Sequence, residues 1–404
     1  MTGALSSPLI SIVVPTRDRP EFAALALEGL RRQSFQDFEV ILSDNALHRP
    51  FEPSPRIFDG ARFRYVRPPK PVWMTDHYEF AVGQARGRYV GVLGDKSLLV
   101  PGALEHVAAE IRKNSPEAVS WRFGVCQPSG DDLAGPCVVT VKGVADSRPV
   151  RVPARDVLEY LLATYLDPGF EADHQLEIRG SIYHGVFSAE LISAMRSRFG
   201  RVFRFYAPDV NAQCAAMQIA RDVTQIRCSL ELIMAGPSNG VDVGVVVAKC
   251  LSTQEEAARG ASGASPRLIP QVSTSIAHVL ASDLVTLSGR TLRPEQWVEL
   301  HGKAAYDIYG IGGWPDRSLR RSQLAALWSS AARFGPDVGR RMLKEKWNAR
   351  RSNARRLVVA QLRSRLGARL DGLRRILATK DASVDRRSFA HVFEALETTG
   401  AANR

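Results

Sequence analysis

Short apolar runs alternate with amphipathic segments over the first 110 residues of the chain. Four runs have the length and the β-branched or aromatic content of buried strands, namely residues 9–14, 38–42, 63–66 and 89–93. Apolar residues at helical spacing follow the first run over 21–33 and precede the fourth over 76–85. Strands that alternate with helices predict an α/β domain with a doubly wound sheet covered by helices on both faces.

The middle of the chain is less regular. Turn residues at 128–132 and 135–136 separate two short β-like runs, 118–125 and 137–141, which predicts a hairpin. Further elements are expected as a helix at 155–166, a strand at 181–187, a helix at 188–198 and a helix at 209–221.

After about residue 250 the pattern predicts helices alone, at about 267–289, 293–309, 317–334 and 337–379. With 404 residues and 45% hydrophobic composition, the chain can bury a large core and form two parts. We therefore expect an α/β domain over 1–245 and a helical, basic region over 246–404.

The net charge of +12 is concentrated in one segment. Between Arg340 and Lys380 there are fourteen Lys or Arg residues against two acids, so the rest of the chain is neutral. The segment also carries leucines at helical spacing, and three interpretations remain open: a solvated helix packed on the domain, attachment to an anionic membrane surface, or nucleic-acid binding. Nucleic-acid binding is the least favoured, because bases stack on aromatic side chains and Trp347 is the one aromatic residue of this segment.

Several other classes find no support in the sequence. There is no apolar run of about 18 residues, the minimum for a membrane-spanning helix, and no signal-peptide pattern at the start. The five cysteines form no C-x-x-C pair, which favours reduced thiols and a cytoplasmic location. Dinucleotide and Walker-type glycine motifs are absent as well.

Four stretches of the N-terminal half resemble the inverting glycosyltransferases of the GT-A fold, of the family-2 type. They are residues 10–20 (ISIVVPTRDRP), 33–45 (QSFQDFEVILSDN), 74–81 (MTDHYEFA) and 85–95 (ARGRYVGVLGD). Each is weak alone, but their order and spacing are specific. The resemblance implies a GT-A domain, a Rossmann-like mixed sheet, that binds a nucleotide-diphosphate sugar, with a UDP-sugar as the expected donor.

The resemblance also assigns a nucleotide-binding set at the ends of the first strands. Its members in this chain are Pro15, Thr16, Arg17, Asp44, Arg67 and Asp76. Asp44 corresponds to the family's carboxylate that accepts a hydrogen bond from the uracil ring. A carboxylate at that position can equally cap the following turn, and Arg67 can be a solvated strand end.

The family places Mg²⁺ or Mn²⁺ on an acidic cluster after the fourth strand, where the metal stabilises the leaving diphosphate. Only Asp95 of that cluster is present, because Lys96 and Ser97 occupy the following positions. Three interpretations follow. Lys96 pairs with the diphosphate in place of the metal, Asp95 carries a weakly bound metal, or the site is catalytically inactive.

The reaction also needs a base that deprotonates the acceptor hydroxyl. Asp209 corresponds to the family's base, an acidic residue at the start of a helix, although aspartate there is also a common helix cap. Glu171 and Asp173 are the alternatives. His184 resembles a histidine of some family members and can equally be a core residue.

The sequence thus predicts an inverting glycosyltransferase of the hexosyltransferase type, acting on a glycan, lipid-linked or surface-polysaccharide acceptor. We expect it in the cytoplasm, with residues 340–380 as a candidate contact to the inner face of the membrane. The competing hypothesis is a catalytically inactive binding or scaffold protein on the same fold, favoured by the loss of acids after Asp95.

Overall fold

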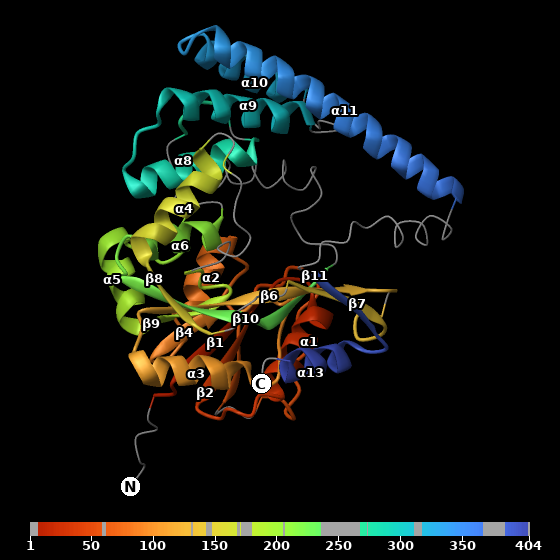
Figure 1. Cartoon of the computed structure of the whole chain (residues 1–404). Helices are drawn as coiled ribbons and strands as arrows, with labels where there is room; N and C mark the ends of the chain where they lie inside the picture. The colour runs from red at the N-terminus through yellow and green to blue at the C-terminus, as the bar shows by residue number, and fades with distance from the viewer. Residues whose placement is uncertain are drawn as a thin grey trace.

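The computed structural model describes residues 7–58, 62–130, 132–142, 148–167, 170, 180–204, 207–235, 267–272, 274–310, 317–366 and 384–402, with the side chains of 353–366 left aside. The strands described form one mixed sheet with helices against both of its faces, and a group of helices lies beyond one of those faces (Figure 1).

The four strands predicted first form a parallel set. They are β1 (Ile10–Thr16), β2 (Phe38–Asp44), β3 (Phe63–Val66) and β4 (Tyr89–Val92). In space their order is β3-β2-β1-β4, so the chain moves to one side of β1 and then returns to its other side. In an open α/β sheet, such a reversal leaves a crevice at the carboxyl ends of the two strands, which is where ligands bind.

The remaining strands extend the sheet beyond β4. They are β5 (Ser97–Leu99), β6 (Ala118–Pro128), β7 (Cys137–Lys142), β8 (Val150–Pro153), β9 (Gly185–Ser188) and β10 (Asp222–Met234). β6 and β7 pair antiparallel, which confirms the predicted hairpin. The strand expected at 181–187 begins only at Gly185. A Cβ there would lie 2.4 Å from the Ser181 carbonyl oxygen, because the chain folds back on itself before the strand.

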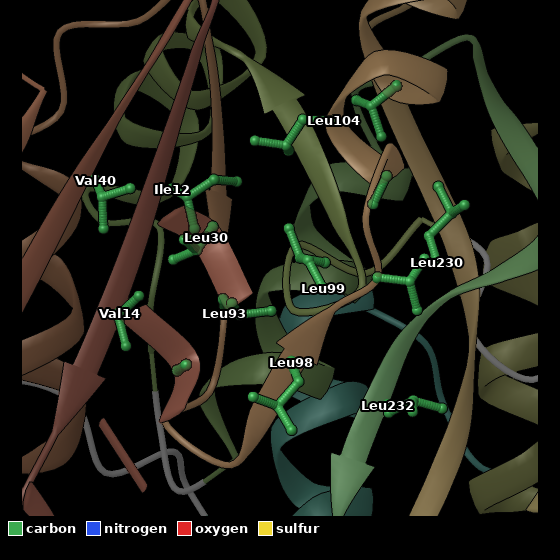
Figure 2. Packing of buried hydrophobic residues seen from close by; sticks show 14 of the residues in the cluster. Ile12, Val14, Leu30, Val40, Leu93, Leu98, Leu99, Leu104, Leu230 and Leu232 are labelled. Carbon is green, nitrogen blue, oxygen red and sulfur yellow. The ribbon is translucent and has the colours of Figure 1, made fainter. Parts of the chain in front are cut away.

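Alternate side chains of the central strands β1 and β2 enter different cores. Ile12 and Val14 pack with α1 (Pro20–Arg31) and α3 (Ala103–Asn114) on one face (Figure 2), whereas Val13 packs on the other. The second face is covered by α2 (Met74–Val82), α4 (Ala154–Leu166), α5 (Ala189–Phe199) and α6 (Pro208–Met217). The doubly wound α/β prediction is therefore confirmed.

The helical region packs on this second layer. It consists of α8 (Ile276–Ser288), α9 (Pro294–Gly310), α10 (Arg317–Ala331) and α11 (Pro336–Leu366). Leu284 and Leu300 meet Leu161 and Cys214 in an apolar cluster that joins α8 and α9 to α4 and α6. α9, α10 and α11 share a separate core, and α11 extends beyond its neighbours at the top of the molecule (Figure 1). None of the helices that the structure describes is both long and apolar enough to cross a membrane.

The end of the chain differs from the expectation of helices alone. β11 (Val384–Phe389) pairs antiparallel with β7, and α13 (Val392–Ala401) places Val392 and Leu396 in the core beside α1. Its sequence, VDRRSF, carries two adjacent arginines and lacks the continuous apolar run that marks a buried strand, so the pattern gave no signal for this edge strand. The predicted division at residue 245 lies outside the described residues. It assigns β11 and α13 to the helical region, whereas both belong to the sheet and its core.

Candidate active site

The carboxyl ends of β1 and β4 meet at the reversal of strand order. Thr16 is the last residue of β1, and Asp95 follows β4 by three residues. The Thr16 hydroxyl donates a hydrogen bond of 2.8 Å to Asp95 Oδ2. Two residues that the resemblance assigns to the nucleotide and to the diphosphate are thus in direct contact, at the position where this type of sheet binds ligands.

Asp95 is held by a partner that the sequence analysis did not identify. Arg19, the residue before α1, donates to both carboxylate oxygens, with Nη2 at 2.7 Å from Oδ1 and Nε at 3.0 Å from Oδ2. The Asp95 side chain is only 2% exposed. Burial raises the pKa of Asp95, and the Arg19 charge, the Thr16 hydroxyl and the Lys96 charge oppose that shift. The sequence signal was indirect: a buried carboxylate needs a counter-charge, and Arg19 lies in the first matching stretch.

These residues do not fit a divalent cation. Mg²⁺ and Mn²⁺ need several oxygen ligands, but both Asp95 oxygens are bonded to Arg19 and Thr16. The next residue is Lys96, and the described parts of the chain contain no group of three or more His, Cys, Asp or Glu side chains able to hold a metal ion. The donor set therefore argues against the metal site that the family resemblance implies.

Lys96 lies at the same strand end. Its ammonium is half-buried and 6.0 Å from the centre of the Phe22 ring on α1. Burial lowers the pKa of Lys96, the positive charge of Arg19 lowers it further, and Asp95 opposes both effects. Because Arg19 is bonded to Asp95 and Lys96 is the next residue of the chain, both cations belong to this strand end.

Asp44 is buried at the end of β2 and organises the loop that follows. Its carboxylate accepts hydrogen bonds of 2.9 Å from the backbone N–H of Ala46, the backbone N–H of Phe51 and the Tyr65 hydroxyl. Burial raises the pKa of Tyr65 to about 12, and the bond to Asp44 and its charge add to this. A carboxylate has about four acceptor positions, so these donors leave about one for a base. The turn-capping interpretation thus has direct geometric support.

The other residues of the nucleotide set lie around this strand end. Pro15 is buried opposite Ser43 in the β1–β2 ladder, and the Arg17 charge contributes to the lowered pKa of His77 on α2. Exposed Arg67 donates from Nη2 to the Ala46 carbonyl at 3.4 Å. Asp76 lies farther along, in the first turn of α2, and pairs with Arg201 at 2.5 Å.

Asp18 is a second residue that sequence reasoning missed. It adopts a left-handed backbone conformation, with φ of 56°. Its Oδ1 accepts the backbone N–H groups of Leu47, His48 and Arg49 at 3.0, 2.7 and 2.8 Å. Burial opposes ionisation, but these three bonds outweigh it and lower the pKa of Asp18. The loops after β1 and β2 are therefore fixed to each other, beside the predicted nucleotide residues.

Asp209 lies in the first turn of α6, as expected. Water reaches this side chain, yet enough protein surrounds it that burial raises its pKa, although the backbone N–H groups of the helix start and the charge of His184 oppose the shift. Burial raises the pKa of Tyr78 to about 12, and the negative charges of Asp95 and Asp209 both contribute. Tyr78 is thus within electrostatic reach of both carboxylates.

His184 pairs with a buried carboxylate. Its Nδ1 is 3.0 Å from Glu231 Oε2, which also accepts the Trp121 indole N–H at 2.8 Å. The Phe123 ring stacks on the imidazole at 4.6 Å. Burial lowers the pKa of His184, but the charge and hydrogen bond of Glu231 and the charge of Asp209 outweigh it and raise the pKa. Glu231 was missed, although a carboxylate inside the apolar run of β10 was a visible signal.

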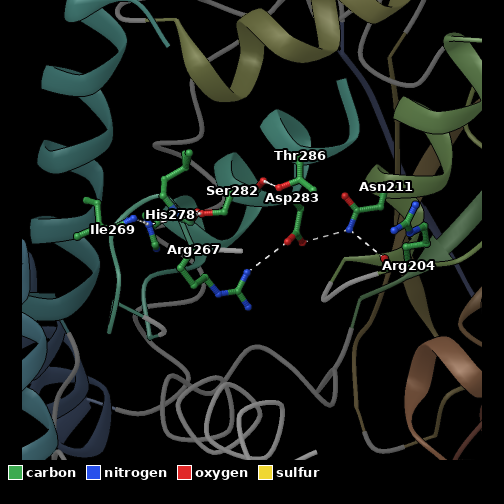
Figure 3. A network of polar contacts seen from close by, with 9 residues as sticks. Arg204, Asn211, Arg267, Ile269, His278, Ser282, Asp283 and Thr286 are labelled. Carbon is green, nitrogen blue, oxygen red and sulfur yellow. Dashed lines mark hydrogen bonds and ion pairs between the residues drawn. The ribbon is translucent and has the colours of Figure 1, made fainter. Parts of the chain in front are cut away.

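The helical region reaches the start of α6 through one polar network (Figure 3). Asn211, two residues after Asp209, donates from Nδ2 to the Arg204 carbonyl at 3.1 Å and to Asp283 Oδ2 at 3.2 Å. Asp283, fully buried on α8, also pairs with Arg267 at 3.3 Å. The alternative bases Glu171 and Asp173 lie outside the described residues.

Comparison with known families agrees with the motifs. Residues 11–135 match the family model described as Glycosyl transferase family 2. This match agrees with the resemblance that the four stretches carry, and the doubly wound sheet with helices on both faces is that of a GT-A domain. No curated protein matches the chain.

Solved structures with a similar course of the chain include Staphylococcus aureus TarS, at 12% identity and a TM-score of 0.41, over 80% of this chain and 54% of that one. The chain thus spans about half the length of that TarS chain. TarS 1–349 in complex with UDP-GlcNAc matches at 13% identity and 0.41, over 85% and 92%. The mannosyltransferase PcManGT from Pyrobaculum calidifontis, in complex with GDP-Man and Mn²⁺, matches at 15% and 0.37, over 82% and 88%.

Proposed function

We propose that this protein is an inverting glycosyltransferase that moves a hexosyl group from a nucleotide diphosphate, most readily a UDP-sugar, to a hydroxyl group of a glycan or lipid-linked acceptor. The observation that carries the proposal is the contact of Thr16 and Arg19 with the buried carboxylate of Asp95, at the ligand end of the sheet where the strand order reverses. A donor diphosphate at Asp95 and an acceptor hydroxyl at Asp209 would face each other across one site.

In the proposed reaction Asp209 accepts the proton of the acceptor hydroxyl. The acceptor oxygen forms a bond to the anomeric carbon while the bond from that carbon to the diphosphate oxygen breaks, and the electron pair leaves with the diphosphate. A single displacement inverts the anomeric configuration. The raised pKa of Asp209 suits this role, because a stronger base takes the proton more readily.

The donor would be held at the ends of β1, β2 and β4. Pro15, Thr16 and Arg17 would border the nucleotide, with Asp44, Arg67 and Asp76 as further contacts, and Asp95 and Lys96 would lie at the diphosphate. Hydrogen bonds within the protein limit the contacts that two of these residues, Asp44 and Thr16, could make with the donor. Asp44 has about one free acceptor position, and Thr16 would act mainly by holding Asp95. We propose residues 1–245, together with β11 and α13, as the catalytic unit.

The test is a panel of nucleotide sugars, followed by donor hydrolysis and sugar transfer with Asp209→Asn. Loss of general-base catalysis should lower turnover by about 10²- to 10⁴-fold and leave nucleotide binding unchanged. The chain offers a matched control in Asp337→Asn, because Asp337 also follows a proline in the first turn of an exposed helix start. Asp209→Asn with normal turnover would rule out this base. A wild-type protein that binds nucleotide but turns over no donor would favour the inactive binding protein.

We also propose that the basic helix meets an anionic membrane surface at the inner face of the membrane. α11 packs on α9 with Met342 and Ala349 and turns its other side outward. On that outer side Leu343 and Trp347 are 47% and 62% exposed, and basic residues surround them. Exposed aromatic and aliphatic side chains among cations are typical of helices that lie at a membrane interface. The leucine stripe farther along falls on residues whose side chains are not described.

Co-sedimentation with vesicles tests this part. The protein should bind phosphatidylglycerol vesicles but not phosphatidylcholine vesicles, and less so at high salt. Trp347→Ala should weaken binding by about 10- to 100-fold, because burying a large apolar side chain contributes about 1.5–3 kcal/mol. Ile276→Ala, an exposed apolar residue on α8, is the control and should have no effect. Equal binding to both vesicle types would contradict the proposal, and selective retention of DNA would favour the nucleic-acid interpretation.

A further inference from the structure

The Arg19 guanidinium is positioned between the buried carboxylate and solvent. Arginine has five N–H donors in a planar fork, and two of them, on Nε and Nη2, are directed at Asp95. Three N–H groups remain, two on Nη1 and one on Nη2. Among the described residues they have no hydrogen-bond partner, and the side chain is 23% exposed. A doubly hydrogen-bonded guanidinium with an accessible outer edge is well suited to bind a phosphate group.

The strand end that carries Asp95 also carries two cations. Arg19 is bonded to the Asp95 carboxylate, and Lys96 is the next residue of the chain. Burial lowers the pKa of Lys96, and the positive charge of Arg19 lowers it further. A divalent cation added here would meet one carboxylate that is already paired and two positive side chains. A diphosphate would instead relieve the repulsion between the two cations.

We propose that the Arg19 guanidinium, anchored by Asp95 and assisted by Lys96, takes the place of a divalent metal ion and binds the donor diphosphate directly. The inference rests on the proposed function and specifies its ligand: the donor is bound through a diphosphate without Mg²⁺ or Mn²⁺. Asp95 then acts as a positioning residue, because it holds the planar fork in one orientation.

The consequence for the reaction is a fixed, protein-borne positive charge at the leaving group. As the bond to the anomeric carbon breaks, one additional negative charge develops on the diphosphate oxygens. Arg19 stays protonated throughout, so its charge is present in both the bound donor and the transition state. Preorganised charges of this kind stabilise the developing anion without reorganisation.

The experiment measures binding of UDP, GDP and inorganic pyrophosphate by calorimetry, in EDTA and in Mn²⁺. Wild-type protein should bind a nucleoside diphosphate equally well under both conditions. Arg19→Ala should weaken binding by about 10- to 100-fold, the value of one or two charge-assisted hydrogen bonds. The matched control is Arg31→Ala on the last turn of the same helix, exposed and paired with Glu28, which should bind like the wild type.

Two further variants keep the test decisive if Arg19→Ala does not fold with Asp95 left unpaired. Arg19→Lys retains the charge and loses the fork, so binding should fall by a smaller factor. In Arg19→Ala/Lys96→Asp, two carboxylates without the competing cations should make binding dependent on Mn²⁺.

The outcomes separate this inference from the proposed function. Wild-type binding that requires Mn²⁺ overturns the role of Arg19 and leaves the glycosyltransferase proposal intact. A folded Arg19→Ala variant that binds like the wild type does the same. Absence of nucleotide binding with and without metal overturns both.

Discussion

The buried aspartate of α8 should control both the stability of the protein and the placement of the proposed base. Asp283 is fully buried, accepts a hydrogen bond from Asn211 at 3.2 Å and pairs with Arg267 at 3.3 Å. In Asp283→Ala the Arg267 guanidinium, 19% exposed, and the Asn211 amide both lose this acceptor. Removing one member of a buried ion pair costs about 3–5 kcal/mol. Because Arg267 retains some contact with water, we expect about 3 kcal/mol.

The effect on activity follows from the position of Asn211 in the first turns of α6. A displacement of about 1 Å of a reacting group can lower turnover by about 100-fold. Asp283→Ala should therefore lower the rate of donor hydrolysis by at least about tenfold. Nucleotide affinity at the ends of β1, β2 and β4 should hardly change. Asp283→Asn keeps the side-chain volume and one acceptor oxygen, so it should lower the free energy of unfolding and the rate of donor hydrolysis less than Asp283→Ala does.

Urea unfolding followed by circular dichroism gives the free energy of unfolding, and donor hydrolysis well below the transition gives turnover. Asp337→Ala, an exposed aspartate that pairs only within its own helix, is the control and should stay within about 0.5 kcal/mol of the wild type. A loss below about 1 kcal/mol in Asp283→Ala would refute the buried network. A large loss of stability with unchanged turnover would refute its role in placing α6.

Three further outcomes test other parts of the structure. In Gly185→Ala the added Cβ would lie 2.3 Å from the Val119 carbonyl oxygen, so the free energy of unfolding should fall by at least about 3 kcal/mol. Gly130→Ala is the control and should be neutral, because the space around Gly130 is open. Burial lowers the pKa of His77 to about 4. Its neutral form is favoured in the folded state, so stability should fall as pH drops from about 6.5 to about 4, by about 3 kcal/mol. His77→Asn should flatten this part of a pH–stability curve. Glu231 and Asp209 raise the pKa of His184 against the effect of burial, so its contribution to stability should be present at low pH and lost as pH rises through its folded pKa. Glu231→Gln should lower that pKa in an NMR titration. An unchanged titration would contradict the pairing.

The strand ends of the site could be predicted because short apolar runs stop at polar residues. Thr16, Asp44 and Asp95 were located in this way, as was Asp209 at the start of a helix. The pattern of apolar residues gave the strand ends and the helix start, and the family resemblance singled out these residues and implied their roles.

What the sequence could not provide is pairing between distant segments. Asp95 and Arg19 are separated by 76 positions and meet only because β4 returns beside β1. His184 and Glu231 meet because β9 and β10 both pair with β6. Such contacts depend on strand order, which no local pattern encodes. For the same reason the sequence could not show that Asp95, which the family resemblance assigns to a metal, is bonded to an arginine.

The return of the chain to the sheet changes how the helical region should be regarded. β11 and α13 belong to the same sheet and core as β1 to β10. Gly400 on α13 packs closely on Pro101, because a Cβ added to Gly400 would lie 2.9 Å from the Pro101 carbonyl oxygen. In topological language, α8 to α11 form an insertion within one domain, tethered at both ends. Shortening the protein from its C-terminus would thus strip an edge strand and part of the core before it removed a single one of those helices. A doubly tethered insertion also cannot swing as a free appendage, so any force that a surface exerts on α11 would be delivered to the sheet at two points.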